Sequence, residues 1–165
     1  MKATNSDMSV DDLIHYVKHL VAEDREELYD EGLRVDESPM PGGYDSSPKG
    51  YLAFASTGGD GVHFSVPDGA AGPVIMTVPM AFDNPNFVVG SDIKEFLSLG
   101  SAYGYFSLEQ LAYNWERTVE AIAAAQEPSA ALQKLSERFD LRPWLSVGVR
   151  LRELEPSLPI KSADA

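Results

Sequence analysis

Three histidines are the residues of this chain with the clearest potential for chemistry. His15 and His19 lie four residues apart, and Glu23 follows at the same spacing. On a helix, this spacing places the three side chains on one face, where they could hold a zinc ion. That face lies opposite the apolar stripe of the expected helix, so the ligands would be exposed with no further residues to orient them. The pattern therefore favours a solvated helix face over a metal site.

His63 is the only other histidine. Val62 and Phe64 flank it, and this alternation is the period of a half-buried strand with His63 on the other face. A Ser-His-Asp site around His63 stays open, because such triads assemble across a fold. However, the sequence has no Gly-x-Ser-x-Gly elbow, and no nucleophile-base pair is visible in it. The chain also has no cysteine, which excludes disulfides, thiolate metal sites and cysteine nucleophiles. We therefore predict no catalytic residue.

A turn-forming cluster, Gly58-Gly59-Asp60-Gly61, lies between two apolar runs. A phosphate-binding P-loop requires a lysine after its last glycine, and none follows here. A dinucleotide fingerprint requires a helix after the glycines, whereas the alternating residues here indicate a strand. The cluster therefore predicts a hairpin turn, and no cofactor is expected.

Charge is the unusual property of the composition. The 165 residues include 26 acidic and 13 basic ones, which gives a formal net charge of -13. Such a field repels nucleic acid and anionic membranes, and it speeds the encounter with a basic protein. Acidity that serves solubility alone is the competing interpretation, and net charge does not decide between the two.

The acidic run "AEDREELYDE", residues 22–31, is the candidate surface for such a partner. A solvated helix end explains the run equally simply. The functional interpretation is a docking surface for a basic protein. Its candidate residues are Glu23, Asp24, Glu26, Glu27, Asp30 and Glu31.

The sequence predicts a cytoplasmic protein of a single domain, residues 1–165. The length suits one domain. The apolar residues near the start are interrupted by Asp7, Asp11 and Asp12, so no secretory apolar core exists. No run approaches the roughly 18 apolar residues that a membrane span needs.

Periodicity and turn signals predict an α+β fold, an antiparallel sheet meander with helices packed on one side. The expected order begins with one helix from Ser9 to Gly32, a loop over 36–50, and strands over 51–56, 62–66 and 74–78. Helices follow from Asp92 to Gly100, from a capping box at Ser107 to the break at Pro128, and over 129–139. Residues 141–154 fit a short strand or irregular packing, and the tail from about 156 is expected to be loose.

Three of these segments carry a family resemblance. They are "GGDGVHFSVPDG", "GPVIMTVP" and "SDIKEFLSL", within residues 50–99. The chain resembles the SMI1/KNR4 group of the SUKH superfamily, whose members typically combine a glycine-rich strand pair, a "GPV" strand and a later "S-x-x-E-F-L" helix. The resemblance implies the same layout of helices against a sheet.

The resemblance also implies function by binding, without catalytic residues. Bacterial proteins of this kind look like immunity proteins that neutralise toxins, often nucleases, and eukaryotic relatives resemble regulatory scaffolds. Because nucleases hold phosphates, they are commonly basic, and an acidic inhibitor would be steered to them. The expected function is a non-enzymatic protein-binding module, with a basic protein such as a toxin nuclease as partner. The alternative is a small-ligand-binding protein or enzyme with a pocket between the meander and loop 36–50.

Overall fold

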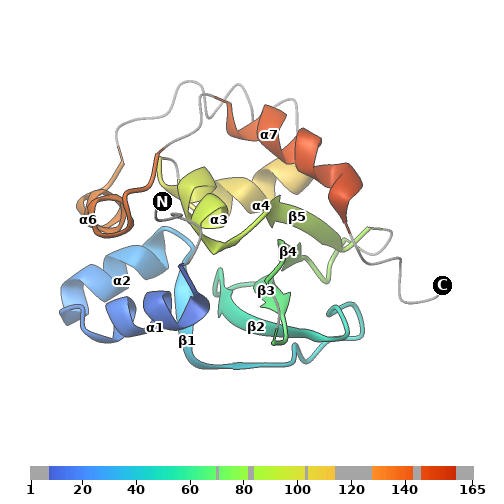
Figure 1. Cartoon of the computed structure of the whole chain (residues 1–165), viewed down its shortest axis with the longest axis horizontal. Coiled ribbons are helices and arrows are strands. Elements are labelled where there is room, and N and C mark those ends of the chain that lie inside the picture. Colours follow the sequence, from blue (N-terminus) through green and yellow to red (C-terminus); the bar gives the residue numbers. More distant parts are fainter. Residues whose placement is uncertain are drawn as a thin grey trace, which may run out of the picture.

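The computed structural model describes residues 8–69, 71–81, 84–102, 104–113, 128–142 and 146–158, without the side chains of 111–113 and 157. Its centre is one five-stranded antiparallel sheet in which each strand pairs with the next along the chain (Figure 1). The strands are β1 (Arg34–Met40), β2 (Tyr51–Ser56), β3 (His63–Pro67), β4 (Val74–Thr77) and β5 (Asn86–Gly90). This meander, together with the helices, confirms the predicted α+β class.

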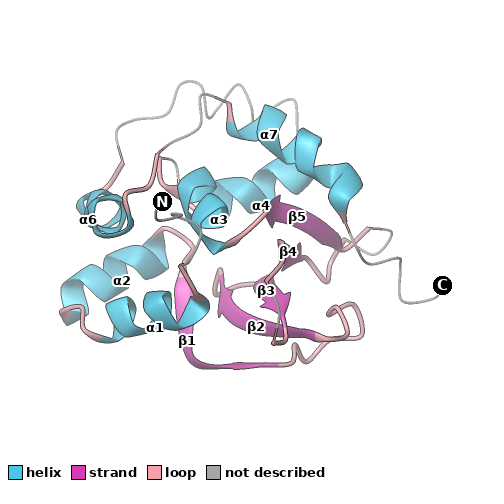
Figure 2. Ribbon diagram, viewed as in Figure 1, coloured by secondary structure: helices cyan, strands magenta, loops and turns pink. Residues whose placement is uncertain are grey.

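The helices form two groups, one next to β1 and the other next to β5. They are α1 (Val10–Lys18), α2 (Ala22–Asp30), α3 (Ile93–Gly100), α4 (Phe106–Tyr113), α6 (Ala130–Phe139) and α7 (Val147–Leu154), followed by a short 3-10 turn, η2 (Glu155–Ser157). Figure 2 shows α3 and α7 beside β5, and α1 and α2 beside β1 with α6 packed on α2. The strands therefore lie between two groups of helices.

An aromatic cluster joins the helices to the sheet. The ring of Phe96 on α3 lies 5.8 Å from that of Phe54, 4.7 Å from that of Phe64 and 5.2 Å from that of Tyr105, measured between centroids. All four side chains are buried, and the Tyr105 hydroxyl donates to the Leu97 carbonyl at 2.7 Å. The face of the sheet that carries Phe54 and Phe64 is therefore the one that the helices cover.

The single helix predicted from Ser9 to Gly32 is wrong, because α1 and α2 are separate. Its start is confirmed: the Ser9 hydroxyl accepts from the Asp12 amide, and the Asp12 carboxylate accepts from the Ser9 amide. The break follows Lys18, where the Arg25 guanidinium donates to the Leu20 carbonyl at 2.8 Å. Because Arg25 satisfies that carbonyl from the next helix, the chain can turn there at low cost.

The predicted loop over 36–50 is also wrong in its first part, because residues 36–40 belong to β1. This edge strand pairs with β2 at Arg34, Val35 and Met40, and its register shifts between Val35 and Met40. A bulged edge strand tolerates charged residues and a proline. Because β1 has this polar composition, the sequence indicated a loop and not a strand. The loop itself covers residues 41–50. Strand β5 was not predicted at all.

The later helix predictions have mixed outcomes. Asp92 caps α3 as expected, and the helix predicted over 129–139 is α6, with Ser129 as its N-cap. Helix α4 instead begins at Phe106, and the Ser107 hydroxyl donates back to the Gly104 carbonyl at 2.6 Å, so the predicted capping box is wrong. Residues 114–127 of that predicted helix lie outside the described residues. The segment predicted as strand or irregular contains α7, capped by Ser146.

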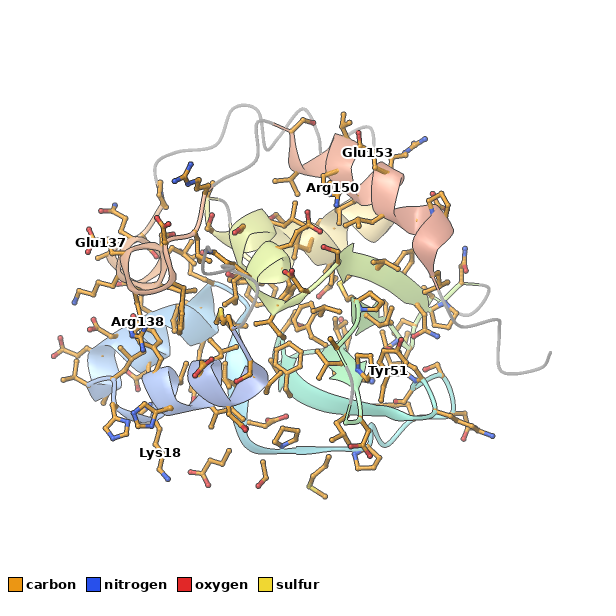
Figure 3. The ribbon with its side chains drawn as sticks, in the orientation of Figure 1. Lys18, Tyr51, Glu137, Arg138, Arg150 and Glu153 are labelled. Carbon is orange, nitrogen blue, oxygen red and sulfur yellow. The ribbon has the colours of Figure 1, made fainter. Side chains whose placement is uncertain are left out.

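An ion pair links α7 to α3. Arg150 donates from Nε to Glu95 Oε2 at 2.8 Å and from Nη2 to Oε1 at 3.2 Å, and it also pairs with Glu153 on its own helix (Figure 3). Burial alone would raise the pKa of the Glu95 carboxyl. The hydrogen bonds from Arg150 and Ser91 outweigh burial and lower this pKa below its ordinary value of 4.5.

This lowered pKa predicts a pH-dependent contribution to stability. Because the folded pKa of Glu95 lies below the unfolded one, its stabilisation is present above about pH 4.5 and is lost as the pH falls through the folded pKa. Urea unfolding at several pH values should show Glu95→Gln less stable than the wild type near neutrality, with a gap that closes on acidification. Glu153→Gln, which removes the more exposed partner of Arg150, should show little effect throughout. A gap for Glu95→Gln that persists unchanged in acid would contradict this assignment.

Candidate functional site

The glycine-rich segment is the hairpin turn between β2 and β3, as predicted. The Thr57 amide donates to the Val62 carbonyl at 3.2 Å, and the Val62 amide donates to Gly59 at 3.1 Å. Gly58 and Gly61 have φ angles of 90° and 75°, which glycine adopts without strain. The turn therefore reverses the chain, and it leaves glycine backbone at the surface of this edge of the sheet.

Loop 41–50 packs on the face of the sheet opposite the helices. His63 Nε2 and the Ser47 hydroxyl lie 2.9 Å apart, and the Tyr44 ring stacks on the His63 ring with 5.6 Å between centroids. The Asn86 amide also donates to the Ser46 carbonyl at 3.1 Å. Neighbouring residues of a strand point to opposite faces, so His63 holds this loop while Phe64 packs in the core.

A groove lies between β1, the start of this loop and the hairpin turn. We call it the acidic groove, and its volume is about 680 Å³. Its lining includes the carboxylates Asp36, Glu37 and Asp60, the side chains Met40 and Tyr44, and His63. The three carboxylates are exposed, and so are Met40 and Tyr44, at 64% and 49%.

The lining of the acidic groove favours a cation. Among its described residues there is no lysine or arginine. The ion pairs found in the described part of the chain involve Lys134 and Arg150, which lie outside the groove. Partial burial raises the pKa of the Asp36 carboxyl, and the nearby His63 opposes this rise. An incoming positive charge would therefore meet carboxylates with no lysine or arginine among the lining residues to compete for them.

The Ser47–His63 contact has the arrangement of a nucleophile and its base. His63 Nδ1 lies 2.8 Å from the Gly61 carbonyl, so Nδ1 carries the proton and Nε2 can accept from the Ser47 hydroxyl. Yet His63 is only 6% exposed, and Gly42 packs so closely that a Cβ there would overlap the Ser47 hydroxyl. This packing favours a role in positioning the loop. The pair was not foreseen, because its members are 16 residues apart with no motif around Ser47.

The shared helix face of His15, His19 and Glu23, which was considered for zinc and interpreted as solvated, does not form as one face. His15 and His19 are exposed neighbours on α1, with ring centroids 4.3 Å apart and His19 Nδ1 2.8 Å from the His15 carbonyl. Glu23 lies beyond the chain break, on α2, so the helical spacing does not continue to it. Within the residues that the structure describes, no group of three or more histidines and carboxylates is suited to hold a metal ion.

The six acidic candidates of residues 22–31 divide into two sets. Asp24 pairs with Lys134 at 3.0 Å, Glu27 Oε1 accepts from the Ala131 amide at 2.5 Å, and Glu31 lies against Gly104. Asp24 and Glu27 therefore hold α2 to α6, and Glu31 is partly buried after the end of α2. The set exposed to solvent consists of Glu23, Glu26 and Asp30.

Comparisons with known proteins do not indicate a function, so the function has to be inferred from the geometry of the molecule. No family model matches the chain, and no curated protein or solved structure matches it. The resemblance to the SMI1/KNR4 group stays a prediction. None of the helices in the described ranges has the length and apolar character needed to cross a membrane.

Proposed function

We propose that this chain is a non-enzymatic protein-binding module that presents an acidic surface to a basic partner protein. The observation that carries the proposal is the acidic groove, where exposed carboxylates adjoin exposed Met40 and Tyr44. Methionine and tyrosine are enriched at protein interfaces, and complementary charge speeds association and selects the partner. The surplus of 13 acidic residues over basic ones acts in the same direction.

The partner class that fits best is a basic toxin nuclease. Such an enzyme holds phosphates with lysine and arginine, and an acidic protein that covers those side chains competes with the nucleic acid. The resemblance to immunity proteins supports the same choice. We place this complex in the cytoplasm, where a toxin's nucleic acid substrate lies. The same charge disfavours nucleic acid and anionic membranes as partners.

The test is titration of the chain with each basic toxin domain encoded beside its gene. We expect a one-to-one complex with one of them, and loss of its nuclease activity in that complex. A basic nuclease from an unrelated system is the control, and it should be inhibited only at low ionic strength, where unspecific charge attraction is strong. Failure to bind any neighbouring toxin would count decisively against the proposal.

A second candidate function is the binding of a small cationic ligand. It is favoured by the presence of both His63 and Asp36 in a groove whose volume lies within the range of ligand sites, about 300–1,000 Å³. Spermidine is a suitable probe, because it carries several positive charges and no other recognition group. A saturable rise in the melting temperature with spermidine, absent with sodium chloride at equal ionic strength, would support this candidate.

A further inference from the structure

We infer that the acidic groove, and not the exposed face of α2, is where the partner docks, and that the groove receives a lysine or arginine side chain of that partner. This inference rests on the proposed function and specifies its contact site. It moves the site from the residues that the sequence indicated to a groove formed by segments distant in sequence.

The two acidic surfaces differ in shape and in the use of their charges. Of the six candidate carboxylates, those of Asp24 and Glu27 bind α6 and that of Glu31 lies partly buried beside Gly104, while the exposed three lie on a convex helix face. Charges on a convex surface are surrounded by water and are screened by salt. Carboxylates around a groove act together on a cation that enters it, because the walls exclude part of the solvent. Each carboxylate of the groove therefore attracts a cation more strongly than an exposed carboxylate of α2 does.

The lining suits a long side chain that ends in a positive charge. Asp36, Glu37 and Asp60 supply the carboxylates, while Met40 and Tyr44 supply exposed apolar surface beside them. Lysine and arginine combine an aliphatic stem with a cationic head, so the stem can pack on Met40 while the head reaches a carboxylate. An arginine can also stack on the tyrosine ring. The chemistry of the groove therefore matches these two residue types.

Addition of a partner strand to β1 is the competing way to dock at this edge. The register of β1 shifts between Val35 and Met40, and Pro39 has no amide hydrogen to donate. A bulge, charged residues and proline are the features that prevent strand addition at sheet edges. Recognition by side chains inside the groove is therefore favoured over pairing along the strand.

The groove is also preorganised and open. Tyr44 is held by its stacking on His63, and the Ser47–His63 contact fixes the loop that forms one wall. A Cβ placed at Gly43 or at Gly59, both in the lining, would meet no atom within 4 Å. The partner can thus enter without displacing protein atoms, and little ordering of the wall is needed on binding.

The test compares two triple variants that remove the same number of negative charges. The groove variant is Asp36→Asn, Glu37→Gln and Asp60→Asn, and the matched control on α2 is Glu23→Gln, Glu26→Gln and Asp30→Asn. The probe is a fluorescent peptide of alternating arginine and glycine, with citrulline replacing arginine in the control peptide. We expect the groove variant to bind the arginine peptide at least about tenfold more weakly than the wild type, and the α2 variant to lose less than about threefold.

A third variant tests the apolar part of the groove without changing charge. Met40→Ser should weaken binding of the arginine peptide by about threefold to tenfold, because the stem of the arginine loses its contact. Thermal unfolding shows whether each variant is folded; all the replaced side chains are exposed, so the melting temperatures should stay near that of the wild type.

The outcomes separate the site from the function. Equal losses in the two triple variants would overturn the groove assignment and leave charge-driven protein binding in place. Equal binding of the arginine and citrulline peptides by the wild type, or no binding of either, would overturn both. If spermidine binds as tightly as the arginine peptide, the groove does not select a protein side chain, and the assignment of lysine or arginine as its occupant would be overturned. With the toxin as partner, the groove variant should again lose at least about tenfold in affinity and the α2 variant less than about threefold.

Discussion

Replacing Phe96 with alanine is expected to lower the free energy of unfolding by about 3–5 kcal/mol, the range for a large aromatic removed from a core. Phe96 is fully buried, and its ring contacts the rings of Phe54, Phe64 and Tyr105. These partners come from β2, β3 and the segment before α4, so the cavity would lie where the helices meet the sheet. The Tyr105 ring cannot move into it without breaking the hydrogen bond from Tyr105 to the Leu97 carbonyl.

Phe106→Ala is the matched control for this prediction. The side chain is the same, but it is 41% exposed at the start of α4. Urea unfolding should therefore give a loss for Phe106→Ala that is well below the loss for Phe96→Ala, on the order of 1 kcal/mol. Similar losses at the two positions would show that the aromatic cluster is not the centre of the core.

Replacing Gly42 with alanine is expected to release loop 41–50 and to cost about 1–3 kcal/mol, the usual range for overpacking. The added Cβ would overlap the Ser47 hydroxyl and would lie 2.8 Å from His63 Nε2. Both atoms belong to the contact that holds the loop on the sheet. Hydrogen exchange should become faster at the Ser47 amide, which donates to the Tyr44 carbonyl in the wild type.

Gly43→Ala controls for the general effect of replacing glycine in this loop. A Cβ at Gly43 meets no atom within 4 Å, so only the unfolded chain is affected, and a small gain in stability is expected. A difference between the two variants assigns the loss to the Ser47–His63 contact. If both variants unfold alike and exchange alike, this contact does not hold the loop.

Local signals explain which elements could be predicted from the sequence. Strands β2, β3 and β4 follow from apolar alternation between turn residues. The caps at Ser9, Asp92 and Ser129 follow from a polar residue placed three positions before its backbone donor. In each case the residues that determine the structure lie next to one another in the chain.

The elements that were missed depend on distant partners. Strand β1 is a strand because β2 pairs with its two ends, although residues 36–39 are charged, polar or proline. The break after α1 is stabilised by Arg25, a residue of the next helix. Neither effect leaves a periodic pattern, so apolar spacing alone could not reveal it.

For the candidate site, the sequence placed a pocket between the meander and loop 36–50 only under the small-ligand alternative, and it did not identify the carboxylates of the groove. Its carboxylates Asp36, Glu37 and Asp60 come from two segments that meet only when β1 pairs with β2, and Tyr44 comes from the loop between them. The sequence drew attention instead to the acidic run on α2, in which Asp24 and Glu27 bind α6 and Glu31 is partly buried beside Gly104. A count of charges could not separate structural carboxylates from exposed ones.

The dependence of the association rate on salt tests the central claim most directly, namely that a negative surface draws in a basic partner. Stopped-flow mixing of the chain with the toxin domain that it binds should give an association rate constant that falls by about tenfold or more from low to physiological ionic strength. The groove triple variant should start from a lower rate and depend on salt less. A rate constant that is the same at all ionic strengths would contradict the claim.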